Sequence, residues 1–146
     1  MRITSKSRHA ITSMFELMMQ NTPVKLAALS DNNGISLSYL EQIFAALRAK
    51  GLVKGQRGPG GGYVLAKNAA DISIADIIRA VDEWVDYAFS RPKTASASSR
   101  PLSTHILWDD LSQHIYSYLS ETSLLDVAAG VDPAKDDYKS VMKKAA

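Results

Sequence analysis

Half of the glycines in this chain fall within five consecutive residues, and this cluster restricts the fold more than any other feature of the sequence. The stretch RGPGGGYVLA at residues 57–66 contains four of the eight glycines and one of the five prolines. Glycine tolerates positive φ and proline fixes φ, which predicts a tight turn between two extended segments. Residues 52–53 and 63–65 are apolar and supply those segments, so we expect a β-hairpin with its tip at residues 57–62.

Helical segments open the chain before this hairpin. Residues 5–20 carry an apolar stripe at helical spacing, formed by Ala10, Ile11, Met14, Leu17 and Met18. Serine and threonine residues at the front can cap this helix, and Pro23 lies behind it. Residues 25–31 predict a second, shorter helix, which the sequence NNG at residues 32–34 ends with a sharp turn.

A third helix is predicted to begin near Ser36 or Ser38 and to run up to Gly51. Ser38 and Glu41 have the spacing of a capping box. The buried face of this helix is a single apolar stripe, formed by Leu40, Ile43, Phe44 and Leu47. A short helix, a glycine-containing turn, a second helix and a hairpin make a winged helix-turn-helix. We therefore expect a mainly α fold with a small β-hairpin, the wing.

The predicted wing tip suits the minor groove of DNA. That groove is about 6 Å wide, so a tip without side chains can enter it, and its negative potential attracts an arginine such as Arg57. The alternative is that the glycines form only a flexible hairpin loop. A phosphate-binding P-loop is not expected, because the stretch lacks a Lys-Ser/Thr pair and precedes a strand instead of a helix.

Charge is divided unevenly along the chain. Residues 1–60 hold eight Lys and Arg against three acidic residues, a net charge of +5, whereas the rest hold nine against twelve, a net charge of −3. A basic first part suggests a polyanionic partner such as double-stranded DNA, and a solvated basic surface is the simpler alternative. Besides Arg57, the basic residues expected near such an interface are Arg2, Lys6, Arg48 and Lys50.

The side of the third helix opposite its apolar stripe carries residue types that read DNA. The side chains are those of Ser36, Ser38, Tyr39, Glu41 and Gln42. Hydroxyls at a helix N-terminus suit phosphate oxygens, glutamine can pair with adenine, and glutamate can accept from the amino group of cytosine. The alternative role for Glu41 is to close the capping box, and the two roles are compatible.

The second half of the chain predicts a means of dimerisation. Residues 72–81 predict a helix that begins near Ser73, and residues 89–103 lose all periodicity and predict a mobile loop. A long helix follows, whose apolar stripe is formed by Leu107, Leu111, Ile115, Tyr118 and Leu119. So small a domain cannot cover this stripe, so we expect it to pack on a second copy and form a homodimer that binds a palindromic site.

Composition disfavours other classes of protein. The 146 residues, 46% of them hydrophobic, suit one domain with an arm, and no apolar run reaches the length of a membrane span, so we expect a cytoplasmic protein. An enzyme is disfavoured because Asp82, Glu83 and Asp86 lie at a helix end without a candidate nucleophile. The alternative function is a winged-helix module that docks a protein without binding DNA, but such a module would typically expose apolar residues around Arg57.

Five stretches together resemble the Rrf2 family of bacterial transcription regulators, and most closely its iron–sulfur cluster regulators. They are MRITSKSRHAI, GISLSYLEQIFAALRAKGLV, RGPGGGYVLAK, AVDEWVD and THILWDDLS. The resemblance implies a dimeric winged-helix repressor or activator, with the third helix in the major groove, the wing in the minor groove and the long helix at the dimer interface. It implies DNA contacts at Ser38, Tyr39, Glu41, Gln42, Arg57, Gly58, Pro59 and Gly60.

The same resemblance exposes a departure from the family. Its members hold a [2Fe–2S] cluster with three loop cysteines, helped by a histidine, and this chain has no cysteine. Aligned on His105, the three cysteine positions fall on Ser90, Ser96 and Leu102, none of which supplies a thiolate. We therefore expect no metal or cofactor, and we expect His105 to pack at the dimer interface. Such a chain is either a natural cluster-free relative or a cluster-free variant.

These observations divide the chain into four parts. Residues 1–86 are expected to form the DNA-binding domain, and residues 87–103 a mobile loop at the position of the family's cluster loop. Residues 104–125 are expected to supply the dimerisation helix and the contacts that follow it. Residues 126–146 are expected to be a weakly ordered tail.

Overall fold

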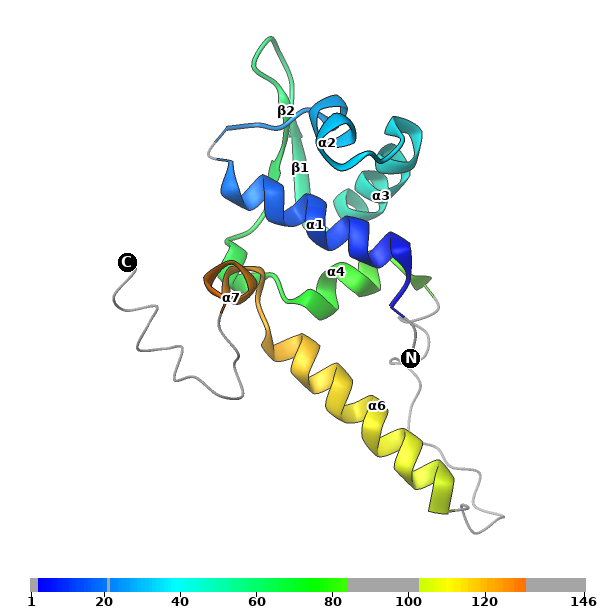
Figure 1. The fold of residues 1–146 in the computed structure, drawn as a ribbon. Coiled ribbons are helices and arrows are strands. Elements are labelled where there is room, and N and C mark those ends of the chain that lie inside the picture. Colours follow the sequence, from blue (N-terminus) through cyan, green and yellow to red (C-terminus); the bar gives the residue numbers. More distant parts are fainter. Residues whose placement is uncertain (1–2, 21, 84–102, 131–146) are drawn as a thin grey trace.

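The computed structural model describes residues 3–20, 22–83 and 103–130. The elements, in chain order, are α1 (Ser5–Met19), α2 (Leu26–Asn33), α3 (Leu37–Ala49), β1 (Val53–Gln56), β2 (Gly62–Leu65), the 3-10 turn η1 (Ala69–Asp71), α4 (Ile74–Val81), α6 (Ser103–Glu121) and α7 (Leu124–Ala129). Figure 1 shows α1 to α4 and the hairpin gathered into one body, from which α6 projects. The predicted fold class, a mainly α winged helix-turn-helix with a long helix behind it, is confirmed.

Ser36 is the N-cap of helix α3, so the helix begins at the first of the two predicted serines, and Ser38 and Glu41 do not form its capping box. Ser36 has extended backbone angles, and its hydroxyl accepts a hydrogen bond from the N–H of Tyr39 at 3.3 Å. Ser38 is already the second residue of the helix, so it cannot be the N-cap. The predicted start near Ser36 or Ser38 is therefore confirmed at Ser36. The capping box of Ser38 and Glu41 was wrong, because two serines precede the apolar stripe and the spacing to a glutamate does not by itself select between them.

The hairpin forms as predicted and its strands are longer than the apolar residues alone indicated. Strands β1 and β2 pair antiparallel from Val53 with Leu65 to Gln56 with Gly62. Val24, in the segment between α1 and α2, pairs with Tyr63 through two backbone hydrogen bonds of 2.8 and 3.0 Å. The base of the wing is therefore tied to the helical part of the domain on the outer side of β2.

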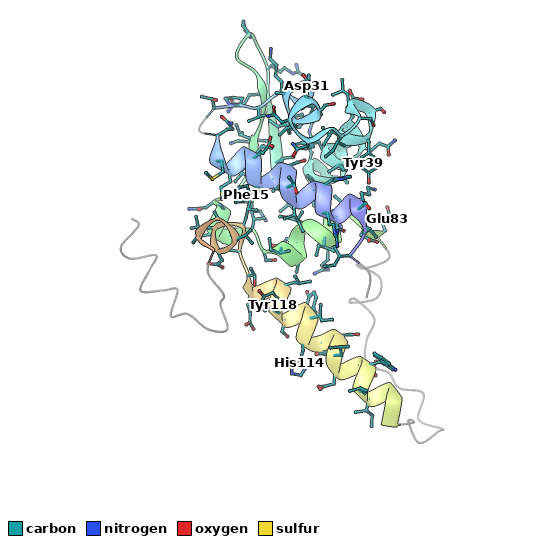
Figure 2. The ribbon with its side chains drawn as sticks, viewed as in Figure 1. Phe15, Asp31, Tyr39, Glu83, His114 and Tyr118 are labelled. Atoms are coloured by element: carbon teal, nitrogen blue, oxygen red, sulfur yellow. The ribbon has the colours of Figure 1, made fainter. Side chains whose placement is uncertain are left out.

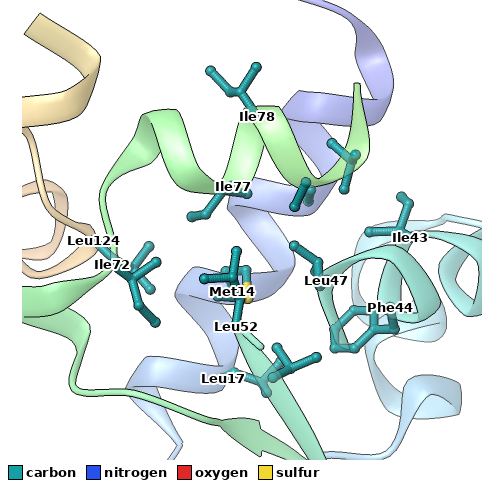
Figure 3. Close-up of a cluster of buried hydrophobic side chains, with 14 of the residues drawn as sticks. Met14, Leu17, Ile43, Phe44, Leu47, Leu52, Ile72, Ile77, Ile78 and Leu124 are labelled. Atoms are coloured by element: carbon teal, nitrogen blue, oxygen red, sulfur yellow. The ribbon is translucent and has the colours of Figure 1, made fainter. Parts of the chain in front are cut away.

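The core lies between α1, α3, α4 and the base of the hairpin (Figure 3). The predicted stripe of α3 is buried throughout, and so are Met14 of α1 and Ile77 of α4. Phe44 contacts Tyr63 edge to face, with ring centroids 5.0 Å apart. Because α3 and β2 pack on the same side chains, the core fixes the helix and the wing relative to each other.

Among the described residues, helix α6 contacts the rest of the domain near its C-terminal end (Figure 1). There Leu119 packs on the core, and the Arg79 guanidinium donates a hydrogen bond to the Tyr116 hydroxyl at 3.2 Å. Figure 2 shows Tyr118 close to this end and His114 farther out along the helix. The other described residues leave most of this 19-residue helix uncovered.

The chain returns to the domain after α6. The N–H of Ile74 donates to the carbonyl of Thr122 at 2.9 Å, and the N–H of Leu124 donates to the carbonyl of Ile72 at 2.8 Å. Helix α7 then runs past the expected boundary after residue 125, and its Asp126 is buried in a capping box with Ser123. Helical structure thus extends several residues into the stretch that we expected to be a tail.

Several sequence predictions concern residues that the structure does not describe. They concern residues 87–102 of the predicted loop, Arg2, Asp86 and the part of the predicted tail beyond residue 130. Within the described ranges, none of the helices is long and apolar enough to cross a membrane.

Candidate nucleic-acid interface

The outward face of α3 carries residues that the sequence predicted to contact DNA. Ser38, Glu41 and Gln42 are exposed in the first two turns, while the opposite face of the helix is buried in the core. This burial fixes the rotation of α3 about its axis. The three polar side chains are therefore presented together to solvent.

Tyr39 differs from its neighbours because α1 holds it. Its side chain is half-buried, and its ring packs edge to face on His9 with the centroids 5.8 Å apart. Figure 2 shows Tyr39 on α3, on the side that faces α1. Any contact of Tyr39 with a ligand would thus come from a ring whose position is already constrained.

The wing tip presents Arg57, Gly58, Pro59 and Gly60, all of them exposed. Figure 1 shows this tip extending beyond the helices of the domain. The fold itself accounts for part of the glycine content. Gly62 has φ of +154°, and a Cβ there would lie 2.6 Å from the backbone of Val24.

Gly60 has no comparable structural reason to be glycine. A Cβ at this position would meet nothing within 4 Å, and its φ lies outside the positive range that disfavours other residues. The fold of the protomer therefore does not require glycine at position 60, and any structural reason for it lies outside the protomer. The sequence alone does not distinguish Gly62, where glycine is required, from Gly60, where it is not. The difference depends on the packing of Val24 against β2, which joins residues far apart in the chain.

Exposed cations surround these two elements. Arg48, Lys50 and Arg57 are exposed, as predicted, and Lys6 is half-buried on α1. Lys54, exposed on β1, belongs to the same set and was not singled out from the sequence. In the described part of the chain, none of these five cations has an ion-pair partner, so each remains available to an anionic ligand.

An open hollow separates α3 from the hairpin. It measures about 430 Å³, and its lining consists of Glu41, Ala45, Arg48, Ala49 and Tyr63. Four of these residues come from α3 and one from β2. The hollow thus joins the two elements predicted to bind DNA.

The predicted stripe of α6 is exposed along most of its length. Leu107 and Tyr118 are 59% and 49% exposed, Leu111 is also exposed, and Ile115 is half-buried. Leu119 packs instead on the core of its own protomer. The exposed side chains of Ile106 and Trp108, which lie on the same helix, were missed by a search restricted to one stripe.

No metal site is found among the residues that the structure describes. Ser90, Ser96 and Leu102 lie outside them, and His105 belongs to the first turn of α6 with its side chain outside the description. The chain contains no cysteine, so the thiolates that a cluster requires are absent from its full sequence. Of the three carboxylates considered for enzyme chemistry, Asp82 is the C-cap of α4, Glu83 is exposed, and Asp86 lies outside the described residues.

Comparison with known proteins agrees with this geometry. A family model described as Rrf2, iron-dependent transcriptional regulator, matches residues 3–130. A putative HTH-type transcriptional regulator of Azotobacter vinelandii is 48% identical over 134 residues, covering 90% of this chain and 82% of that protein. The HTH-type transcriptional regulator IscR of Yersinia pestis is 46% identical with the same coverage.

Solved structures of similar regulators have the same fold. CymR, described as the global cysteine regulator of B. subtilis, superposes with a TM-score of 0.76 at 32% identity, covering 90% of this chain and 99% of its own. IscR of T. potens has a TM-score of 0.74 at 30% identity, covering 93% and 92%. These similar proteins are regulators and not enzymes. This chain therefore belongs to the Rrf2 family and is a transcriptional regulator of the IscR type.

Proposed function

We propose that this regulator acts as a homodimer that binds a palindromic DNA site, with α3 of each protomer in a major groove and the wing in the adjacent minor groove. The observation that carries the proposal is the shared core beneath α3 and β2. Phe44 of the helix packs on Tyr63 of the wing, so α3 and the strand that leads from the wing tip are held in one fixed arrangement. Two rigidly coupled elements can read two neighbouring grooves at once.

In this arrangement α3 supplies base readout. Gln42 can pair with the adenine N6 and N7 positions, and Glu41 can accept from the amino group of cytosine. Ser38, at the start of the helix, suits a phosphate oxygen. Arg57 enters or lines the minor groove, where negative potential favours a guanidinium.

The dimer is proposed to form through α6. An exposed apolar stripe on a helix that its own domain does not cover is typical of an interaction surface. A twofold dimer places two copies of α3 on two half-sites, which explains the expectation of a palindrome. The alternative of a protein-docking wing is disfavoured, because the large apolar side chains exposed in the described residues lie outside the wing.

We expect the purified protein to prefer one class of genomic DNA fragment, containing a roughly palindromic site of about 25 base pairs, over random duplex. Fluorescence anisotropy at several salt concentrations measures both the preference and its electrostatic part. The logarithm of the binding constant should fall steeply with the logarithm of salt concentration, by about 0.9 per phosphate neutralised. Equal affinity for all fragments and for random duplex would contradict the regulator's proposed mode of action.

We propose further that the regulator works without an iron–sulfur cluster. Serine and leucine at the family's cysteine positions cannot replace thiolates, and one histidine cannot hold a cluster alone. Protein purified anaerobically from iron-replete cells should be colourless, without the visible charge-transfer absorption of a cluster. Iron and sulfide in stoichiometric amounts in that sample would overturn this part of the proposal.

The helix and the wing should respond differently to substitution. Arg57→Ala should weaken binding to every site, since the minor groove distinguishes little beyond A·T from G·C. Glu41→Ala should lose little on the best site and gain on poor sites, because a carboxylate repels DNA wherever no donor faces it. Glu41→Ala should therefore reduce the difference in binding free energy between the best site and poor sites. A good polar contact sets that difference at about 1–3 kcal/mol per base pair.

Competition binding with each half-site position varied in turn compares the two variants on equal terms. Lys67→Ala, which removes an exposed cation on the chain beyond β2, is the control for loss of charge alone. If Glu41→Ala retains the full base preference, Glu41 does not read a base, and the reader must be Gln42 or Tyr39.

A further inference from the structure

Of the residues that line the hollow between α3 and β2, only Glu41 has a role in the proposed base readout. Ala45 and Ala49 are exposed and lie one helical turn apart on α3. Longer side chains at these positions would occupy the hollow that they line. The surface is therefore open at a place where a helix facing DNA commonly carries long polar side chains.

Tyr63 forms the wall of the hollow on the side of the wing. Its ring packs on Phe44, and its backbone N–H and carbonyl are both bonded to Val24. The side chain is half-buried, and within the described ranges its hydroxyl has no hydrogen-bond partner. Tyr63 thus offers an unused polar group on a firmly held ring.

If the proposed function is right, the geometry of DNA determines which part of the duplex crosses this hollow. A major groove and the adjacent minor groove are separated by one sugar–phosphate strand. If α3 occupies the first and the wing the second, that strand crosses the surface between α3 and β2. Arg48, which is exposed and has no ion-pair partner in the described part of the chain, stands at this crossing.

We propose that the hollow seats a phosphate of this strand, with Arg48 supplying charge, Tyr63 donating a hydrogen bond from its hydroxyl, and Ala45 and Ala49 leaving room for the backbone. Glu41 lies two turns before Arg48, about 10 Å away along the helix axis. The phosphate therefore lies at the Arg48 end of the hollow, and the Glu41 end faces the base edges. This seat fixes the register of α3 on the DNA and carries no sequence information itself.

Two substitutions test the seat without disturbing the core. Ala45→Leu fills the hollow from an exposed helical position, and Tyr63→Phe removes the hydroxyl while keeping the ring on Phe44. Each should weaken binding about tenfold on the preferred duplex and on random duplex alike, because a phosphate is common to both. Ala128→Leu, the same change at an exposed position on α7, should bind as the wild type does.

Single neutral methylphosphonates, placed at each backbone position of a half-site in turn, identify the phosphate. A methylphosphonate at the position between the two grooves should weaken binding by the wild type more than binding by Tyr63→Phe, because the variant has already lost the hydroxyl contact and keeps only the contact from Arg48. The proposal is overturned if the wild type selects its site but every methylphosphonate weakens binding by Tyr63→Phe as much as binding by the wild type. It is also overturned if Ala45→Leu binds DNA with wild-type affinity. A wild type that selects no site overturns the proposed function instead, and the seat with it.

Discussion

Leu111→Asp in α6 is expected to convert the dimer to monomers and to lower affinity for the palindromic duplex by about 100-fold or more. Leu111 is 46% exposed in the protomer, belongs to the apolar stripe and lies near the middle of α6. In a twofold interface the substitution places two carboxylates within an apolar contact, where their desolvation is costly. Each monomer then binds one half-site and loses the advantage of a linked second half-site.

Light scattering and anisotropy on the same samples measure mass and affinity together. Gln113→Asp adds the same charge to an exposed position about 200° around the helix from Leu111, and should leave both unchanged. Because Leu111 is exposed, the melting of the monomer's domain should not depend on the substitution. A Leu111→Asp protein that stays dimeric would show that the α6 stripe is not the interface.

Gly62→Ala is expected to lower the free energy of unfolding by about 2–4 kcal/mol and to weaken DNA binding with it. The new Cβ would lie 2.6 Å from the carbonyl carbon of Val24, and φ of +154° is itself unfavourable for alanine. Relief requires the hairpin to move away from Val24, which breaks the two backbone hydrogen bonds between Val24 and Tyr63. The wing then loses its fixed position relative to α3.

Gly60→Ala separates the role of the tip in binding from its role in folding. Nothing lies within 4 Å of a Cβ at Gly60 or at Gly55 on β1, so chemical denaturation should find both alanine variants close to the wild type in stability. If the tip enters the minor groove, Gly60→Ala should bind DNA more weakly, and Gly55→Ala should not. A stable Gly60→Ala variant with full affinity would contradict insertion of the tip, while unchanged stability of Gly62→Ala would contradict the Val24 contact.

Sequence patterns predicted the elements of this fold well because their signals are local. The apolar stripe of α3 and the glycine cluster of the wing each depend on residues that are close in the chain. The helix start was less certain, because Ser36 and Ser38 are both plausible caps and only the extended backbone at Ser36 decides between them. Helix α7 was missed, since its six residues are fixed by pairing with the chain near Ile72.

The sequence suggested the residue types of the candidate interface, but it did not indicate how the fold brings them together. Arg57 and Glu41 could be chosen by chemistry and by their places in the pattern. The pairing of Val24 with Tyr63 joins residues far apart in sequence, and no periodicity indicates it. The same holds for Leu119, which continues the α6 stripe in sequence but packs on its own core because α6 meets the domain there.

Hydroxyl-radical cleavage of the bound duplex tests most directly whether each protomer holds α3 in a major groove and its wing in the adjacent minor groove. The radical attacks sugars from the minor groove, so it reports the position of the wing. The expected result is a pair of protected minor-groove windows, one beside each half-site and related by the twofold axis of the site. Protection of a single window, or protection absent from the minor groove while the site is occupied, would contradict this mode of binding.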